Sequence, residues 1–233
     1  MAWHALKGCV ITQEQDAQMP NKHASNLIAT LAALVLLPGC GPIATIAWLI
    51  HGPEMVPAQF DGLKGKRVAV VCLDGNSLGG PGGEADAIAK AVSMTLGKHV
   101  TEINMVRQTE VADWLDSHGD DLTDYRDVGR GVRADMVVGI DLLSFNLHEG
   151  QTLLRGKAKV GVKVYDMTKA GELVYESAPK EIAWPENGAR HVTENEANFR
   201  TNFIYTLADR ISGDFYEVEV GQNIGSDARH LAN

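Results

Sequence analysis

The residues of this chain that could do chemistry are spread along it rather than grouped. A glycine-rich segment, Gly75–Gly83, follows an apolar run and precedes a helix-like pattern, and backbone N–H groups at such a junction can bind an anion. Its spacing matches neither G-x-G-x-x-G nor G-x-x-x-x-G-K-[ST], and Glu84 and Asp86 would repel a phosphate. Ser77 lies where a nucleophile could, but nothing in the sequence positions a base. We therefore predict a mobile or partner-ordered loop rather than a nucleotide site.

Histidines and acidic residues form no recognised metal or catalytic motif. The eight histidines include no H-E-x-x-H or H-x-x-E-H pattern. Asp120, Asp121, Asp124 and Asp127 could bind a cation but lack the spaced oxygen ligands and glycine of a calcium loop, so we interpret them as a solvated turn. Neither G-x-S-x-G nor a compact Ser/His/Asp phrase is present. The sequence predicts no cofactor, no metal site and no enzymatic activity.

Cys40 has the clearest chemistry, because it ends Leu37-Pro-Gly-Cys40 after the apolar run Leu27–Leu37. A basic flank at Lys22, a short apolar core and a small residue before the cut make a secretory signal. A cysteine directly after the cut resembles the lipobox of bacterial lipoproteins, although Pro38 stands where Ala or Ser is commoner. In that family the cysteine sulfur is diacylated, the signal is removed and the new N-terminus is acylated. The resemblance implies a lipid on Cys40 that attaches the protein to a membrane.

Two other interpretations of this segment remain open. Leu27 to Ile50 is long enough, at about 1.5 Å per residue, to cross a bilayer core of about 30 Å as a transmembrane anchor. Pro38-Gly39 and Gly41-Pro42 would break such a helix near its middle. Alternatively, the run is a buried helix of a soluble protein, but it is almost free of polar residues and shows no amphipathic period.

The apolar run Leu27–Leu37 and Cys40 divide the chain into four expected parts. Residues 1–39 are the leader, and Met19 is the expected true start because Glu14 and Asp16 do not suit a signal peptide. Residues 40–62 form a lipidated tether interrupted by Gly and Pro. Its section Ile43–Ile50 is apolar and lies either at the membrane interface or on the domain. Residues 63–217 form the domain, and residues 218–233 a flexible tail.

Charge and cysteine content exclude several classes of protein. The chain has 21 Lys and Arg against 30 Asp and Glu, a net charge of −9 at pH 7. This acidic balance argues against nucleic acid as a partner, since nucleic acid requires a basic footprint. Cys72 lies in the apolar run Val68–Leu73, which indicates a small buried hydrophobe rather than a reactive thiol.

The hydrophobic pattern predicts a single α/β domain with a mixed sheet whose second half is an antiparallel meander. Strands are expected at Val68–Leu73, Val100–Val106, Met136–Leu147, Leu154–Met167 and Glu172–Ala183, the last with an edge or bulge at Pro179. Helices are expected at Glu84–Lys98, after a Thr109 N-cap, at Asp124–Arg133, and after the capping box Thr193–Glu196. In the final helix Phe199, Phe203, Leu207 and Ile211 share one face.

Two stretches carry a family resemblance, Gly129-Arg-Gly-Val-Arg-Ala-Asp-Met-Val-Val138 and Leu154-Arg-Gly-Lys-Ala-Lys-Val-Gly-Val-Lys-Val-Tyr-Asp166. With the strand, glycine-rich loop and helix before them, they resemble the α/β domain of bacterial envelope lipoproteins related to the TolB N-terminal domain. That group includes the penicillin-binding-protein activator LpoB and the curli-assembly lipoprotein CsgG. The resemblance covers residues 63–217 and implies a non-catalytic domain that binds other envelope proteins.

The most distinctive surface feature expected of this acidic chain is a row of basic residues on one strand. Arg155, Lys157, Lys159 and Lys163 share one parity of Leu154–Met167. This row could receive an acidic partner or a polyanionic envelope polymer, although lysines also simply keep a sheet face or edge soluble. Trp184 is either a contact at a loop mouth or a lid on the core.

We predict a lipid-anchored protein of the envelope that faces the periplasm, with the outer membrane favoured because Gly41 is not Asp. The alternative is a periplasmic small-ligand binder or enzyme that uses Gly75–Gly83, with Asp74, Asn76, Ser77 and His148 as its candidate groups.

Overall fold

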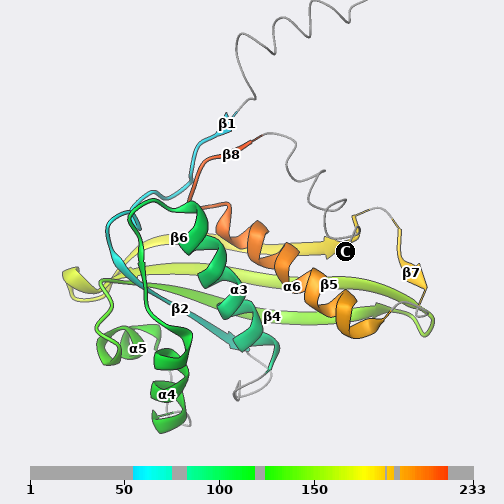
Figure 1. The fold of residues 1–233 in the computed structure, drawn as a ribbon, viewed down its shortest axis with the longest axis horizontal. Coiled ribbons are helices and arrows are strands. Elements are labelled where there is room, and N and C mark those ends of the chain that lie inside the picture. The colour runs from blue at the N-terminus through cyan, green and yellow to red at the C-terminus, as the bar shows by residue number, and fades with distance from the viewer. Residues whose placement is uncertain (1–54, 75–82, 119–123, 187, 192–194, 220–233) are drawn as a thin grey trace, which may run out of the picture. The chain divides into compact units, whose positions relative to one another are not determined.

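The valine-rich run expected to be a doubly covered strand is the centre of the fold. In the computed structural model, which describes residues 55–74, 83–118, 124–186, 188–191 and 195–219, this run forms β2 (Arg67–Asp74). Every residue from Val68 to Cys72 is buried. β2 lies parallel to β3 (Asn104–Met105) on one side and to β4 (Met136–Glu149) on the other (Figure 1). A strand with neighbours on both sides and helices on both faces has no position for a polar side chain, which explains its composition.

The second half of the sheet is the predicted antiparallel meander. β4 pairs with β5 (Leu153–Asp166), and β5 pairs with β6 (Glu172–Trp184), so the sheet order is β3–β2–β4–β5–β6. The short β7 (Arg190–His191) pairs with the start of β5. The fold is therefore α/β with a mixed sheet, as the sequence predicts.

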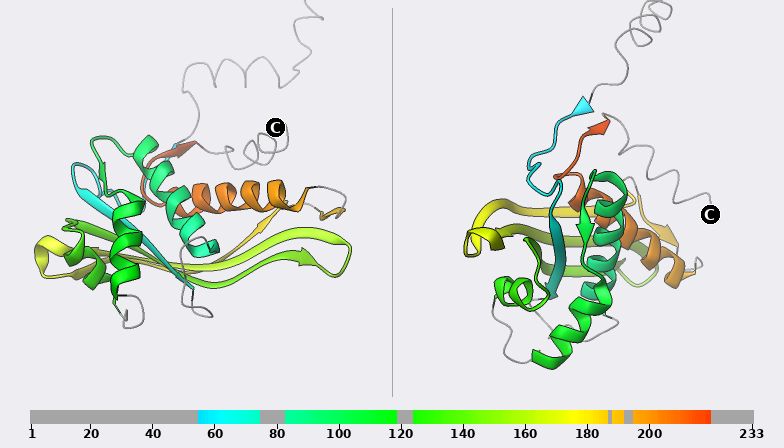
Figure 2. Two further views of the ribbon diagram at one scale, coloured as in Figure 1. Left: turned by 60° about the horizontal axis from the view of Figure 1, so that its bottom comes forward. Right: turned by 60° about the vertical axis from the view of Figure 1, so that its left-hand side comes forward.

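Helices cover the two faces of the sheet in pairs (Figure 2). α3 (Glu84–His99) and α6 (Glu196–Ser212) pack on one face and enclose the larger core. α4 (Gln108–His118) and α5 (Tyr125–Gly131) pack on the other face against β2 and β4 and enclose a smaller core. The four residues expected to share one face of the last helix are all buried: Phe199, Phe203, Leu207 and Ile211.

Strand β5 shows the alternation that its sequence predicts. Leu154, Ala158, Val160, Val162 and Val164 are at most 2% exposed and face α3 and α6, whereas the basic residues between them are intermediate or exposed. The turn that follows contains the 3₁₀ helix η2 (Met167–Lys169), with Ala170 and Gly171 at positive φ. β6 is an edge strand, and its register against β5 shifts around Pro179. Both expectations for this proline are therefore confirmed.

Three local predictions are wrong. β3 is only two residues long, because the chain turns at Thr101 and Glu102, where Glu102 has a φ of 60°, before it pairs with β2. Thr109 lies within α4, which already begins at Gln108. The N-cap of α6 is Asn195, whose side chain accepts from the N–H groups of Ala197 and Asn198; the expected cap Thr193 lies outside the described residues.

The chain around residue 60 packs against the end of α6. β1 (Met55–Val56) pairs with β8 (Val218–Glu219), and the N–H groups of Gln59 and Phe60 both donate to Asp214 O, at 2.9 and 3.0 Å. The Phe60 ring lies 5.6 Å from Tyr175 and 6.4 Å from Phe215. Residues 55–62, expected in the tether, and residues 218–219, expected in the tail, thus contact the domain directly. Residues 40–54 and 220–233 lie outside the described residues.

Candidate functional site

Two of the features singled out from the sequence lie outside the described residues. These are the proposed lipidation site Cys40 with its leader, and positions 75–82 of the glycine-rich segment. Gly83, the last residue of that segment, is the N-cap of α3 and contributes no side-chain hydrogen bond. None of the helices in the described part of the chain is long and apolar enough to cross a membrane.

The basic residues of β5 lie between acidic neighbours on both adjacent strands. Glu149 at the end of β4 accepts from Lys157 Nζ at 3.2 Å and from Arg155 Nη1 at 3.4 Å. These contacts, that from Lys157 first, lower the pKa of the Glu149 carboxyl. Lys163 Nζ lies 3.1 Å from Asp141 Oδ2, and this contact raises the pKa of Lys163. Three of the four basic side chains are therefore in ion pairs within the sheet.

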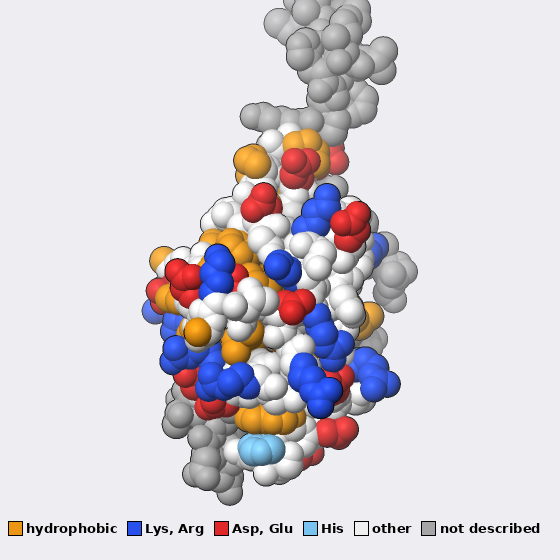
Figure 3. Space-filling model, turned by 90° about the vertical axis from the view of Figure 1, so that its left-hand side faces the viewer, with side chains coloured by type: hydrophobic (Ala, Val, Ile, Leu, Met, Phe, Trp, Pro, Cys, Tyr) orange, Lys and Arg blue, Asp and Glu red, His pale blue; other side chains and the backbone are white. Residues whose placement is uncertain are grey.

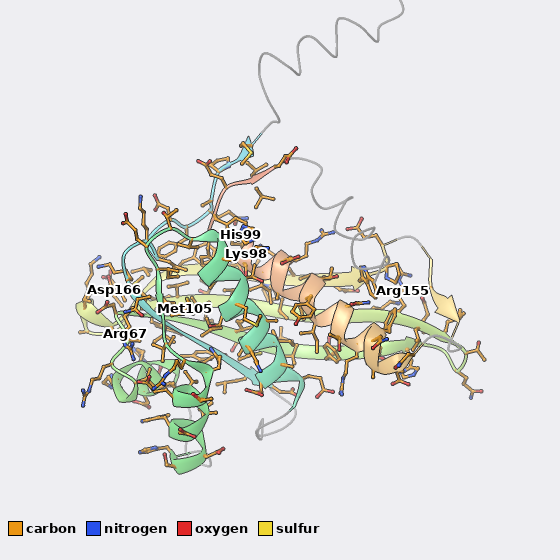
Figure 4. The ribbon with its side chains drawn as sticks, in the orientation of Figure 1. Arg67, Lys98, His99, Met105, Arg155 and Asp166 are labelled. Atoms are coloured by element: carbon orange, nitrogen blue, oxygen red, sulfur yellow. The ribbon has the colours of Figure 1, made fainter. Side chains whose placement is uncertain are left out.

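Lys159 differs from the other three basic residues. Its side chain is exposed, and in register it lies opposite Ser144 of β4 and Glu181 of β6. It forms no ion pair with another described residue. Arg155 lies at the far end of the sheet from Arg67 and Asp166 (Figure 4). The end of the molecule in Figure 3 shows Lys and Arg interspersed with Asp and Glu rather than gathered. The β5 surface is accordingly one of alternating charge, with Lys159 as its uncompensated cation.

Asp141 forms a polar cluster that the sequence analysis missed. Its Oδ1 accepts from Tyr125 OH at 2.6 Å and its Oδ2 receives Lys163, so it joins α5, β4 and β5. Burial first, and then the bond to Asp141, raises the pKa of Tyr125. Gly139 leaves room for the Tyr125 ring, because a Cβ there would lie 2.7 Å from it. A single carboxylate inside the apolar run Met136–Leu147 was the signal that could have revealed this cluster.

A small cavity lies at the carboxyl end of β2, where a ligand-binding alternative would place it. It has a volume of about 30 Å³, and its walls come from β2 (Val71, Cys72), α3 (Ala85, Ala89) and α4 (Val111, Ala112). β2 leads into α3 on one face of the sheet and β3 leads into α4 on the other. Open α/β sheets commonly bind ligands at such a switch in direction.

Of the polar groups named for that alternative, Asp74 and His148 do not come together at this cavity. Asn76 and Ser77 lie outside the described residues. His148 lies six residues beyond Leu142, the partner of Asp74 in β4, which is roughly 20 Å along a strand. Its Nε2 is 3.7 Å from Glu196 of α6 instead. Asp74 and His148 are thus kept apart by the register of β2 and β4.

Other chemistry is equally unsupported within the described residues. Cys72 is 7% exposed, and burial raises the pKa of its thiol, so it is protonated and inert, as the sequence predicts. Trp184 is 1% exposed and its ring centroid lies 4.9 Å from that of Phe199, so it is a lid on the core and not a surface contact. Within the described ranges no three His, Cys, Asp or Glu side chains come together as a metal site requires.

Comparison with known proteins finds similarity at the level of structure alone. No family model and no curated protein matches the sequence. Among solved structures, lipoprotein GNA1162 from Neisseria meningitidis is 10% identical, with a TM-score of 0.41 over 63% of this chain and 98% of that one. The LpoB C-terminal domain from Salmonella enterica is 15% identical, with a TM-score of 0.36 over 53% and 87%. A minor lipoprotein from Acinetobacter baumannii is 11% identical, with a TM-score of 0.33 over 63% and 89%. Scores this low assign the chain to none of these proteins.

Proposed function

We propose that this chain is a lipid-anchored protein of the bacterial cell envelope whose α/β domain is a non-catalytic protein-interaction or assembly module. The observation that carries the proposal is the sequence Leu37-Pro-Gly-Cys40 at the end of a short apolar run. A cysteine in that position can be acylated after cleavage, and two or more acyl chains hold a protein on a bilayer stably. The domain then faces the periplasm, and the outer membrane is the proposed destination.

The interaction role is supported by the surface chemistry of the domain. The acidic balance of the chain disfavours a nucleic acid partner. The face of β5 that carries Arg155, Lys157, Lys159 and Lys163 presents alternating charges on a rigid sheet. Alternating charge on a rigid surface favours one register of an oppositely patterned partner, and so contributes specificity more than affinity. We propose this face as one partner surface, with Lys159 as the cation available for a new ion pair.

Membrane fractionation tests the anchor and its destination. The wild-type protein should sediment with outer-membrane vesicles, and Cys40→Ser should no longer be processed or sorted there. A control substitution, Cys72→Ser, removes a buried thiol and should leave the distribution unchanged. A wild-type protein that stays in the soluble fraction would contradict the proposal.

A ligand-binding role is the second candidate, because the cavity beside β2 lies where that role requires one. The small size of the cavity limits what it can hold. A water molecule needs roughly 10–15 Å³, so a cavity of about 30 Å³ holds only a few water-sized groups. The cavity therefore suits one short aliphatic group rather than a whole cofactor.

A further inference from the structure

The cavity between β2, α3 and α4 exists because strand β3 stops early. Val106 N donates to Val68 O, and beyond it the Gln108 side-chain amide donates to Val70 O at 3.3 Å. Backbone carbonyl groups along a strand point to alternate sides. The Cys72 carbonyl therefore faces the same edge of β2 as those of Val68 and Val70, at a point where β3 has already ended. Gln108 thus closes one end of the cavity, and the edge of β2 beyond it has no strand neighbour among the described residues.

Small side chains keep the cavity open. Ala85 and Ala89 lie one turn apart on α3, and Ala112 faces them from α4. Longer side chains at these positions would fill a space of this size. Val111 and Leu115 add further apolar surface on the α4 side.

Two carboxylates line the same cavity. Asp86 comes from the first turn of α3 and Asp116 from α4. Neither forms an ion pair with another described residue, although the exposed Lys90 follows Asp86 by one helical turn. The carboxylates of the β5 surface differ in this respect, because Glu149 and Asp141 are both paired. A cavity with a partly apolar lining and two carboxylates that have no ion-pair partner among the described residues complements a ligand with a short aliphatic part and a cationic end.

We propose that this cavity receives a lysine or arginine side chain of a partner protein. Such side chains place their methylene stem against apolar surface and keep the charged end in a polar environment. The stem would contact Ala89 and Val111, and the charge would lie between Asp86 and Asp116. The proposal rests on the proposed function as an interaction module and names a contact that its partner must supply. An acidic site on this end of the domain would act independently of the β5 surface.

The direct test is an NMR titration of the detergent-solubilised full protein with Nα-acetyl-lysine methylamide. Amide signals of the cavity residues Ala89, Val111 and Ala112 should shift at millimolar concentrations. The norleucine analogue has the same four-carbon stem without the ammonium group and should bind up to about fivefold more weakly, since one exposed ion pair contributes up to about 1 kcal/mol. The double variant Asp86→Asn/Asp116→Asn should lose a similar factor. Asp113→Asn removes an exposed carboxylate of α4 that does not line the cavity and should bind as the wild type does.

Several outcomes would overturn the proposal. Amide shifts absent from the cavity residues would do so, as would equal binding by the double variant and the Asp113→Asn control. Cadaverine that binds more tightly than the capped lysine would indicate a site for a free diamine instead of a protein side chain. Ala112→Leu should fill the cavity and abolish the shifts while the thermal midpoint stays near that of the wild type. If the titration shows no binding but Cys40 is acylated, the proposal of a lipid-anchored interaction module still stands. The failure of one proposal can therefore be distinguished from the failure of the other.

Discussion

Asp214 is a buried carboxylate on which three parts of the chain converge. It is 4% exposed, and both of its oxygens lie 2.7 Å from Lys180 Nζ of β6. Tyr175 OH donates to it at 3.1 Å and Gln59 Nε2 at 3.0 Å. Burial and the neighbouring Asp214 raise the pKa of Tyr175 to about 12, so the phenol stays protonated and remains a donor across the physiological range.

Replacing Asp214 should therefore destabilise the domain. Asp214→Ala leaves the Tyr175 hydroxyl and the Lys180 ammonium without their acceptor, and because the Lys180 side chain is 40% exposed to water the loss should be about 1–3 kcal/mol. Urea unfolding of the variant and the wild type measures the difference. Asp113→Ala, at an exposed position, should change the free energy of unfolding by no more than about 0.5 kcal/mol. Equal effects of the two substitutions would refute this role for Asp214.

Asp166 should make stability depend on acidic pH. Hydrogen bonds from the Thr168 hydroxyl at 2.6 Å and the Thr168 N–H at 3.0 Å lower the pKa of its carboxyl in the folded state. The resulting stabilisation is present above the unfolded pKa of about 4 and is lost as the pH falls through the lower folded value. Asp166→Asn should flatten the fall in thermal midpoint between about pH 5 and pH 2. Parallel curves for variant and wild type would show that Asp166 makes no such contribution.

At the scale of single residues, the sequence shows which side chains are charged but not which of them form ion pairs. The parity of β5 predicts that Lys157 and Lys163 lie on the less buried face, and they do. Their ion pairs depend on which β4 residues lie opposite, and β4 contains two register shifts that no single sequence reveals. A cationic stripe was therefore a reasonable expectation, whereas the folded strand carries alternating charge.

Helix α6 and strand β5 fit together through an aromatic side chain and a glycine. A Cβ placed on Gly156 would lie 2.4 Å from the Phe203 ring, which is fully buried. Gly161 lies in the same strand, and a Cβ there would meet nothing nearer than 3.7 Å. The two glycines therefore form a matched pair for testing this contact.

Gly156→Ala should displace α6 from the sheet, because overpacking a core costs typically about 1–3 kcal/mol. Gly161→Ala should be neutral or slightly stabilising, since alanine removes conformational freedom from the unfolded chain without a clash. Thermal unfolding of both variants checks this, with near-UV circular dichroism as a measure of aromatic packing. A Gly156→Ala protein as stable as Gly161→Ala would contradict the packing described here.

At the scale of elements, long periodic segments were predictable and their ends were not. β5 and α6 contain repeated apolar spacing, and their faces were predicted correctly. Thr193 and Asn195 are both good N-cap residues, and tertiary packing decides that α6 begins at Glu196. β3 was expected to be longer because Val100–Val106 is apolar in part, but Val100 remains bonded to the last turn of α3. The cavity beside β2 lies where the ligand-binding alternative expects one, next to the edge that the short β3 leaves open.

At the scale of the whole molecule, described residues upstream of position 63 already pack on the domain. Among the described residues, Met55 contacts the domain where β1 pairs with β8, and Gln59 and Phe60 contact it as well. The sequence analysis put the boundary at residue 63, since Pro57 and the preceding glycines favour irregular structure. Phe60 and Gln59 pack against residues more than a hundred positions away, and no local pattern predicts such contacts.

A truncation series tests where the domain begins. A protein that starts at Leu63 loses the Phe60 ring contacts and the two hydrogen bonds to Asp214 O, whereas one that starts at Pro53 keeps them. A loss of about 2–3 kcal/mol would lower the thermal midpoint of a domain this size by roughly 5–10 °C. Differential scanning calorimetry of both proteins gives the comparison. Equal midpoints would place the boundary at residue 63 after all.

The central claim is that Cys40 is the acylated N-terminus of the mature protein. Intact mass measurement of membrane-extracted protein, wild type and Cys40→Ala, tests it most directly. We predict a wild-type chain that begins at Cys40 with the added mass of several acyl chains, and a variant without them. An uncleaved chain of unmodified mass, the same in both proteins, would contradict the claim and point to a transmembrane anchor.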